Sequence, residues 1–214
     1  MPTYTVSKHF PWQGPVSKRT VQVCRMFGLA LDRLSDHAPT HSCCIEVSPG
    51  DIVYITGPSG SGKSVLLHEL ERQVPAGDAV RLTQMPLPDD RTVIDCFESD
   101  VVATLRTLST VGLGDAFSVV NRPCNLSEGQ RYRFRLAQAL ATGKRFIFAD
   151  EFGSELDRIT AATLAFNIHR FAKRTDTTFV LASSHRDFLL DLAPDVVVTK
   201  DFGGAAQVVY RTAR

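Results

Sequence analysis

The sequence predicts an α/β fold with a mostly parallel sheet, because apolar β-rich runs alternate with segments of helical periodicity. Two further observations support it. A glycine-rich segment stands between the first central strand and its helix, and the next central strand ends in two acidic residues. Ligands of open α/β sheets bind at the carboxyl edge. The expected strands are IVYIT (52–56), RFIFAD (145–150) and TFVLAS (178–183), and the long helices are KSVLLHELERQV (63–74) and LDRITAATLAFNIHRFAKRT (156–175).

The chain of 214 residues is expected to form a single domain, residues 1–214. Residues 1–42 contain four prolines and show an irregular pattern, which predicts an N-terminal arm leading into the first strands. The strand CCIEV and the turn SPGD follow. Residues 85–125 mix prolines with short helical patterns, and together with the next helix they predict a helical subdomain over about 85–140. DVVVTK and AQVVYR predict the last two strands.

Composition and charge are ordinary for a globular protein. The formal net charge is +1, so overall electrostatics indicates no class of partner. The distribution is uneven, however, because four basic residues precede the first acidic residue, Asp32. This basic arm is either a solvated surface or a contact for nucleic acid or another acidic partner.

The cysteines and the hydropathy indicate a cytoplasmic protein. Five cysteines form an odd count without a C-x-x-C pair, which fits free thiols in a reducing compartment. Cys43 and Cys44 are expected to face opposite sides of a strand. No apolar run resembles a signal peptide or a membrane span. If the protein works at a membrane, another chain is expected to provide the span.

The segment GPSGSGKS matches the phosphate-loop pattern G-x-x-x-x-G-K-[ST]. Its glycines let backbone N–H groups turn toward phosphate oxygens, and the following helix adds a partial positive charge. Lys63 is expected to reach the terminal phosphates, and the Ser64 hydroxyl to bind Mg²⁺. A plain glycine-rich turn is the alternative, but the strand–loop–helix context favours phosphate binding. The predicted nucleotide-binding residues are Gly57, Pro58, Ser59, Gly60, Ser61, Gly62, Lys63, Ser64 and Val65.

The strand RFIFAD places Asp150 and Glu151 at the carboxyl edge of the sheet. Asp150 is expected to hold Mg²⁺ directly or through water. Glu151 is expected to polarise the water that attacks the γ-phosphate. A solvated acidic turn is the alternative, and the accompanying phosphate loop makes the catalytic interpretation the stronger one.

The segment LSEGQ (126–130) has two interpretations. Ser127 and Gln130 form an S-x-x-Q capping box for a helix that Gly143 would end. The same five letters are also typical of a nucleotide-contacting signature. The segment alone does not decide between them.

Six elements in this order resemble the ABC-type ATPases, a branch of the P-loop NTPases, over nearly the whole chain. They are the phosphate loop, Gln84 in RLTQMP as the Q-loop, LSEGQ as the signature, FIFADE as the Walker B strand, SELD (154–157) as the D-loop, and LASSH ending in His185 as the switch histidine. LSEGQ is then both a helix cap and a signature.

This resemblance implies that two copies dimerise head to tail with ATP between them. The phosphate loop of one copy would face the signature of the other, so that Ser127, Gly129 and Gln130 bind the nucleotide across the interface. His185 would contact the γ-phosphate and order the catalytic water. Gln84 would sense Mg²⁺ and water. One chain type carrying both halves implies a homodimer with two equivalent sites.

Three positions depart from the family pattern: Glu128 replaces a glycine, Phe152 stands where proline is common, and Val65 replaces a second hydroxyl. None removes an essential group. For the aromatic residue that stacks on adenine the candidate is Phe27, which is equally well explained as a core residue.

A closer resemblance, carried by RMFGL, LSEGQRYRFRLA and ADEFGSELDR, is to soluble ABC-type ATPases often fused to a GNAT-type acetyltransferase. Such a partner would be a separate chain or absent here. The favoured function is an ATP-driven dimerisation switch on a cytosolic enzyme or nucleic acid, because residues 85–125 make a short helical subdomain. The alternative is the subunit that energises a membrane permease. A non-hydrolysing module is disfavoured by Glu151 and His185.

Overall fold

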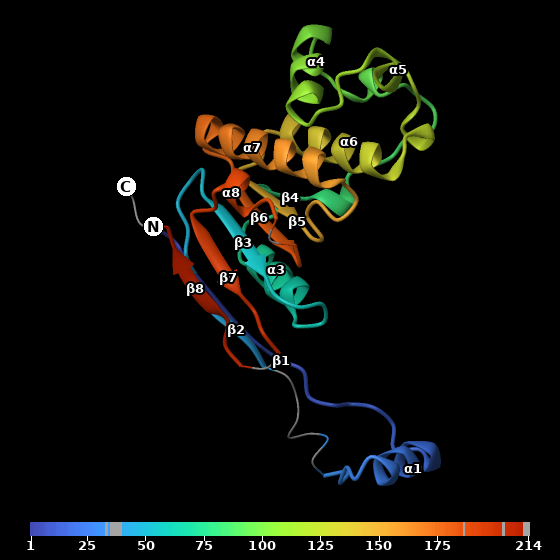
Figure 1. Ribbon diagram of the computed structural model, residues 1–214, viewed down its shortest axis with the longest axis vertical. Helices are drawn as coiled ribbons and strands as arrows, with labels where there is room; N and C mark the ends of the chain where they lie inside the picture. Colours follow the sequence, from blue (N-terminus) through green and yellow to red (C-terminus); the bar gives the residue numbers. More distant parts are fainter. Residues whose placement is uncertain (33, 35–39, 186, 203, 212–214) are drawn as a thin grey trace.

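A computed structural model describes residues 1–32, 34, 40–185, 187–202 and 204–211. Its centre is a six-stranded sheet with the order β4-β5-β6-β3-β7-β8 (Figure 1). The first five of these strands run parallel, and β8 pairs antiparallel with β7 at one edge. The strands are β3 (Ile52–Thr56), β4 (Ala79–Arg81), β5 (Phe146–Ala149), β6 (Thr178–Ser183), β7 (Val196–Thr199) and β8 (Gln207–Tyr210).

The central strands are mostly apolar because helices or a second sheet cover both faces of the sheet. Every residue of β3 is buried, and its side chains alternate between two cores. Ile52 and Tyr54 face the core shared with α6 (Glu128–Ala141) and α7 (Arg158–Thr175). Val53 and Ile55 face the core shared with α3 (Lys63–Glu71) and the N-terminal strands. The predicted α/β fold is confirmed.

A two-stranded antiparallel sheet packs beside α3. It consists of β1 (Thr3–His9) and β2 (Thr40–Glu46), paired from Thr3 opposite Glu46 to His9 opposite Thr40. Cys43 is buried and Cys44 is exposed on β2, as predicted, and all five cysteines are free thiols. The segment 1–42, expected to hold an N-terminal arm and the first strands, thus begins with the strand β1, which the sequence pattern did not locate. Its pattern was too weak to detect because Val6 is its only buried residue.

The segment between β1 and β2 contains a second unpredicted element, α1 (Lys18–Met26). Ser17 caps this helix by accepting a hydrogen bond from the Thr20 N–H. Cys24 is its only buried residue, and Figure 1 shows α1 standing away from the sheets. The helix lacks an apolar face packed on the core, which is the signal that sequence patterns detect.

The predicted helical subdomain forms a layer at one end of the molecule (Figure 1). Asp100 and Asp115 cap its first two helices through backbone N–H groups. Its elements are the 3-10 turns η1 (Leu82–Gln84), η2 (Ile94–Cys96) and η3 (Pro123–Asn125), with α4 (Val101–Thr110), α5 (Ala116–Val119) and α6. The short α8 (Leu189–Leu192) precedes β7. None of the helices in the described ranges is long and apolar enough to cross a membrane.

Helix α6 begins and ends as its sequence predicts. The Ser127 hydroxyl accepts from the Gln130 N–H, and the Gln130 side chain accepts from the Ser127 N–H, which completes the capping box. Thr142 is the C-cap, and Gly143 follows with φ +63°, the left-handed conformation that glycine adopts without strain. The helix thereby presents Phe134 fully buried toward the core.

Replacing Phe134 with alanine should lower the free energy of unfolding by about 3–5 kcal/mol, because it opens a cavity where the ring packs edge-on against Phe97 at 6.0 Å. Guanidinium denaturation followed by circular dichroism measures the change. The matched control is Phe117→Ala on α5, where the side chain is 86% exposed and the expected change is within about 0.5 kcal/mol. Equal losses in both variants would contradict the assigned core.

Candidate functional site

A cleft of about 470 Å³ lies at the carboxyl ends of β3, β5 and β6. These three strands are neighbours in the sheet and parallel, so their following loops meet at one edge. The loop after β3 supplies Lys63 and Ser64, the loop after β5 supplies Asp150 and Glu151, and the loop after β6 supplies His185. The structure therefore brings together the predicted phosphate-binding and hydrolytic residues. Ser59, Gly60, Gly62, Val65, Ser154, Glu155 and Ser183 also line the cleft.

The loop between β3 and α3 depends on glycine at two places where other parts of the chain approach closely. Gly57 has φ +148°, and a Cβ there would lie 1.9 Å from the Lys200 carbonyl oxygen. Gly62 has φ +99°, and a Cβ there would lie 2.2 Å from the His41 ring. No larger residue fits either position without moving its neighbour. Backbone packing of this kind holds the loop in the curled form that points N–H groups at an anion.

The first turn of α3 is available to an anion. Its N-cap, Gly62, is in the left-handed conformation and offers no side-chain hydrogen bond to the helix. Backbone N–H groups at such an end carry a partial positive charge. The Lys63 ammonium lies beside them and donates to the carbonyls of Gly57 at 2.9 Å and Pro58 at 2.8 Å. This end of the cleft is therefore chemically suited to an anion such as phosphate.

Burial lowers the pKa of Lys63, and the negative charges of Asp150 and Glu151 partly oppose that shift. The three charged groups thus share one electrostatic environment although they follow different strands. A phosphate oxygen entering the cleft would favour the charged form of Lys63 further.

Two buried polar residues support the loop from behind, and the sequence analysis did not identify either. His41 on β2 packs against Gly62, and Phe10 lies edge-on to its ring at 5.7 Å. Lys200 is fully buried, and its N–H donates to the Thr56 carbonyl at 2.8 Å. His41, Cys43 and Ile45 are buried at every second position of β2. This two-residue period could have indicated that His41 faces the core. Burial, aided by the positive charge of Lys200, lowers the pKa of His41.

Glu151 occupies a strained backbone position, with φ +52° in the left-handed region. Its N–H donates to Asp150 Oδ1 at 3.0 Å, and the next N–H, from Phe152, donates to the Ala182 carbonyl at 2.8 Å. The Phe152 ring is fully buried against Phe188, with ring centroids 5.4 Å apart. Phe152, at the position where the family commonly has proline, therefore anchors the turn through its buried ring. The neighbouring Glu151 stays exposed in the cleft.

His185 is exposed at the end of the loop after β6. Its N–H donates to the Ser183 hydroxyl at 3.2 Å, and its carbonyl accepts from the hydroxyl of Tyr54, a buried residue of β3. These two contacts fix the backbone beneath the imidazole. His185 also lines the cleft together with the phosphate loop.

Comparisons with known proteins agree with this arrangement. Residues 46–189 match the protein family described as AAA domain. The chain is 30% identical to the aliphatic sulfonates import ATP-binding protein SsuB 1 of Paracoccus denitrificans, over 81% of this chain and 79% of that relative. The chain belongs to the ABC-type ATPases. It binds and hydrolyses ATP.

Other relatives and solved structures extend the comparison. The methionine import ATP-binding protein MetN of Streptococcus agalactiae is 26% identical over 73% of this chain, which spans 55% of that relative's length. The dimeric structure of MJ0796, a bacterial ABC transporter cassette, superposes with a TM-score of 0.63 at 18% identity, covering 80% of this chain and 90% of that one. The structural likeness shows the ABC ATPase fold.

The signature of this ABC-type ATPase lies outside the cleft of its own chain. Ser127 is exposed at the start of α6, and Ser127, Gly129 and Gln130 are all absent from the cleft lining. A Cβ on Gly129 would lie 2.9 Å from the Glu155 carbonyl, so the signature helix packs directly on the D-loop. The Gln130 side chain is already engaged, since its Nε2 donates to the Ser118 hydroxyl at 2.9 Å. The backbone N–H of Gln130 is engaged as well, because it donates to the Ser127 hydroxyl at 3.3 Å.

Gln84 and Phe27 also lie outside the lining of the cleft. Gln84 is exposed at the end of η1, while its neighbours Leu82 and Thr83 line an adjoining cavity that also contains Glu151. Phe27 is the C-cap of α1 and is 75% exposed, and Figure 1 shows that helix apart from the sheet. The sequence suggested Phe27 only through its position upstream of the phosphate loop. The α1 segment carries it away from the loop instead.

The donor set fits a magnesium ion held partly by substrate. Within the part of the chain that the structure describes, no three histidine, cysteine, aspartate or glutamate side chains gather as metal ligands. The Ser64 hydroxyl and the Asp150 carboxylate both line the cleft. One or two protein oxygens, completed by phosphate and water, are the ligands that Mg²⁺ takes in nucleotide sites.

The loop packing predicts a graded response to alanine. Gly62→Ala should destabilise the protein by about 1–3 kcal/mol more than Gly60→Ala, because only the former drives a Cβ into His41. Both glycines have positive φ, at +99° and +77°, but the nearest atom to a Cβ on Gly60 is 4.0 Å away. Urea unfolding of the two variants measures the difference. Equal losses would show that backbone strain alone accounts for the glycines.

His41 also predicts a pH dependence. Because its pKa is lowered in the folded protein, the unfolded chain binds the proton first as the pH falls below about 6.5. The stability contributed by neutral His41 is therefore complete above that pH and is lost as the pH decreases. Urea midpoints at pH 7.5 and 5.5 should differ less for His41→Leu than for the unaltered protein. An unchanged difference would remove His41 as its source.

Proposed function

We propose that this ABC-type ATPase is the ATP-binding subunit that energises a membrane transporter, working as a homodimer. The observation that carries the proposal is the cleft that joins a phosphate loop to Glu151 and His185. The named relatives support the biological role, since SsuB 1 and MetN are import ATP-binding proteins. They favour this role over the soluble switch preferred from sequence. The chain spans only 55% of the length of MetN. The activity of a complete transporter is therefore proposed for this chain and not taken over from that relative.

The phosphate loop binds the triphosphate of ATP in this proposal. Backbone N–H groups of the loop and of the first turn of α3 surround the phosphate oxygens, and Lys63 places its ammonium on the terminal ones. Ser64 and Asp150 would hold Mg²⁺, which neutralises phosphate charge when bound. Gln84 approaches the same edge only if η1 moves, because it does not line the cleft.

Hydrolysis is assigned to Glu151 and His185. The Glu151 carboxylate orients and polarises the attacking water, and the strained, anchored turn fixes its direction. His185 hydrogen-bonds the γ-phosphate and the same water. Both groups line the same cleft as Lys63. The reacting phosphate would therefore meet a cation and the water-activating pair in one place.

The aromatic platform for adenine is better assigned to Phe10 than to Phe27. Phe10 contacts His41, which packs on Gly62 of the phosphate loop. Phe27 has no comparable route to the cleft, because α1 stands apart from it. A partly exposed ring at the edge of a phosphate loop offers a face on which a base can stack.

The position of the signature supports a composite site. Ser127 and the N-terminus of α6 are exposed and lie outside the cleft of their own chain. A second copy, related by a twofold axis, would place them on the γ-phosphate of the first. ATP would then hold two copies together, and its hydrolysis would release them. The transporter permease would be driven by this closing and opening.

The second candidate is the ATP-driven switch on a cytosolic enzyme, such as an acetyltransferase, or on nucleic acid. It is favoured by the N-terminal arm, where Lys18, Arg19 and Arg25 accompany an exposed helix that the sheets do not cover. In this case the protein would be cytoplasmic throughout its cycle. Under the transporter proposal it would sit at the cytoplasmic face of a membrane.

Glu151→Gln should reduce ATP turnover at least about 100-fold while ATP still binds, because the amide cannot polarise water. With Mg-ATP the variant should accumulate as a dimer, measured by light scattering after size exclusion. The control Glu98→Gln changes an exposed residue outside the cleft lining and should keep turnover. A monomer under saturating Mg-ATP would count against the dimer proposal. Isolated from native membranes, the trapped variant should bring a polytopic permease. A soluble enzyme or RNA instead would establish the switch.

Ser127→Arg should leave the monomer folded and prevent ATP-dependent dimerisation, because a bulky cation replaces the exposed N-cap at the proposed interface. Ser127→Thr is the matched control, since it keeps both the hydroxyl and the helix cap. Light scattering of each variant in the Glu151→Gln background gives the result. If the arginine variant still dimerises with ATP, the signature does not lie at the interface.

A further inference from the structure

The segment between β1 and β2 presents apolar side chains that the fold leaves exposed. Cys24 is the only buried residue of α1. The exposed large apolar residues of the segment include Val16, Val23, Met26, Phe27, Leu29 and Leu31. Apolar side chains that gather on one exposed part of a protein mark a site of interaction. None of these residues lines the ATP cleft, so ATP binding does not explain them.

Three basic side chains accompany this apolar surface. Lys18, Arg19 and Arg25 all belong to α1, and residues 10–31 contain no aspartate or glutamate. Within the part of the chain that the structure describes, none of the three forms an ion pair. The segment therefore offers uncompensated positive charge to an anionic partner.

The cations and the apolar side chains point in the same direction along the helix. Arg19, Val23 and Met26 follow one another at intervals of four and three residues, so they share one face of α1. Val23 is 50% exposed and Met26 is 77% exposed. The helix thus combines charge and apolar surface on the side that is turned away from its own buried residue.

The place of α1 in the molecule limits what can cover it. Figure 1 shows α1 standing apart from both sheets, at the end opposite the helical subdomain. A projecting helix can touch a broad, flat surface without a collision between that surface and the sheets. A membrane is such a surface.

The chemistry of the segment favours lipid over nucleic acid. Nucleic acid would bind the cations but would gain little from aliphatic side chains such as Val23, Leu29 and Leu31. In a bilayer interface, apolar side chains enter the acyl boundary while lysine and arginine reach the headgroup phosphates. The exposed apolar residues lie in the helix and in the turn after it, and a fluid bilayer does not require them to form one regular stripe.

We propose that α1 and the following turn to Leu31 bind the surface of a membrane that contains anionic lipids. Val23 and Met26 enter the interface, and Lys18, Arg19 and Arg25 contact lipid phosphates. The helix lies along the surface, as basic amphipathic helices do. This binding goes beyond the role proposed for the ATP cleft, because it requires neither ATP nor a permease.

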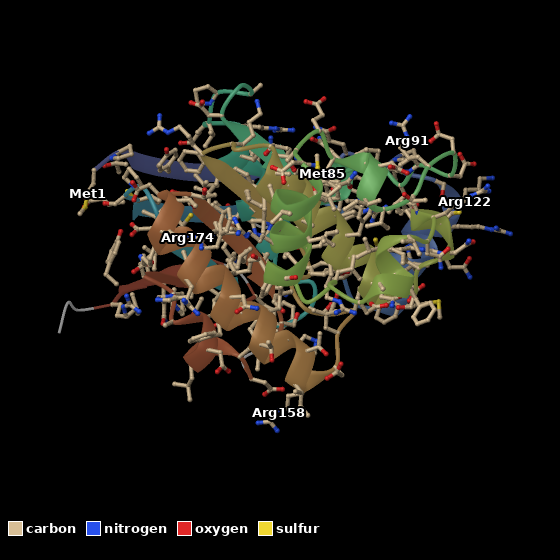
Figure 2. All side chains as sticks on the ribbon, turned by 90° about the horizontal axis from the view of Figure 1, so that it is seen from above. Met1, Met85, Arg91, Arg122, Arg158 and Arg174 are labelled. Atoms are coloured by element: carbon tan, nitrogen blue, oxygen red, sulfur yellow. The ribbon has the colours of Figure 1, made fainter. Side chains whose placement is uncertain are left out.

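The first test measures co-sedimentation of the purified full-length protein with vesicles. Binding to equal parts of phosphatidylglycerol and phosphatidylcholine should be at least about tenfold stronger than binding to phosphatidylcholine alone, and added salt should weaken it. Combined Lys18→Gln, Arg19→Gln and Arg25→Gln should weaken binding to the anionic vesicles at least about tenfold. The matched control removes three exposed cations elsewhere and should leave binding nearly unchanged; it combines substitutions to glutamine at the residues labelled in Figure 2 as Arg122, Arg158 and Arg174.

The second test separates insertion from attraction by charge alone. Combined Val23→Gln and Met26→Gln keeps the charge and the helix propensity of α1 but removes apolar surface, so binding to the anionic vesicles should fall at least about tenfold. Leu190→Gln changes a side chain on α8 that is 93% exposed, and it should leave binding unchanged. Circular dichroism and ATP turnover without vesicles should match the unaltered protein for all these variants, which separates a failure here from a failure of the ATP cleft.

Fluorescence reports the insertion directly, because the chain has one tryptophan, Trp12. In a Trp12→Phe background, Val23→Trp should shift its emission to shorter wavelength with anionic vesicles, whereas Phe117→Trp on α5 should not. No binding to anionic vesicles, unchanged binding of the Val23 and Met26 glutamine variant, or no emission shift would overturn the proposal. An RNA or DNA oligonucleotide that binds more tightly than the vesicles, and that the same variants lose, would overturn it in favour of nucleic acid.

Discussion

The close packing of other parts of the chain around the phosphate loop is the constraint on which the site depends. The Lys200 carbonyl and the His41 ring occupy the space that side chains at Gly57 and Gly62 would need. The loop can therefore curl tightly between β3 and α3 and turn its N–H groups toward one point. The other groups of the cleft are arranged around this point. Asp150 and Glu151 follow β5, and His185 follows β6. In the sheet β5 pairs with β6, and β6 pairs with β3. The parallel sheet thus sets the spacing between the phosphate loop and the residues proposed to activate water.

The phosphate loop and the signature segment lie apart within one chain. The cleft holds the phosphate loop, the carboxylates and His185, whereas Ser127 begins a helix outside it. The capping box stabilises the start of the helix within one copy. The remaining N–H groups at this helix end are suited to bind the phosphate of ATP held by a second copy. Gly129 in the signature helix packs closely against the Glu155 carbonyl. Glu155 belongs to the loop that directly follows Glu151. Approach of a second copy would therefore act on the hydrolytic residues through a short mechanical connection. This provides a physical basis for coupling dimerisation to turnover.

Much of the fold was predictable because its strands and helices carry strong local signals. The continuous apolar run of β3, the glycines of the loop and the Ser127 cap each correspond to one backbone geometry. β1 and α1 were missed because Val6 and Cys24 are their only buried residues. Lys200 was missed for a different reason: a lysine at a strand end suggests solvent, and its burial arises from tertiary packing. Phe27 was misplaced relative to the cleft because the course of the chain between β1 and β2 is not encoded in local periodicity.

The most direct test of the composite site mixes two inactive variants. Lys63→Ala removes the phosphate contact of its own cleft, and Ser127→Arg removes the signature offered to a partner. In a mixed head-to-tail dimer, one site combines both defects and the other combines an intact loop with an intact signature. ATP turnover of an equal mixture should therefore exceed the turnover of either variant alone, rising as the proportion of mixed dimers rises. A mixture no more active than the separate variants would contradict a site shared between two copies.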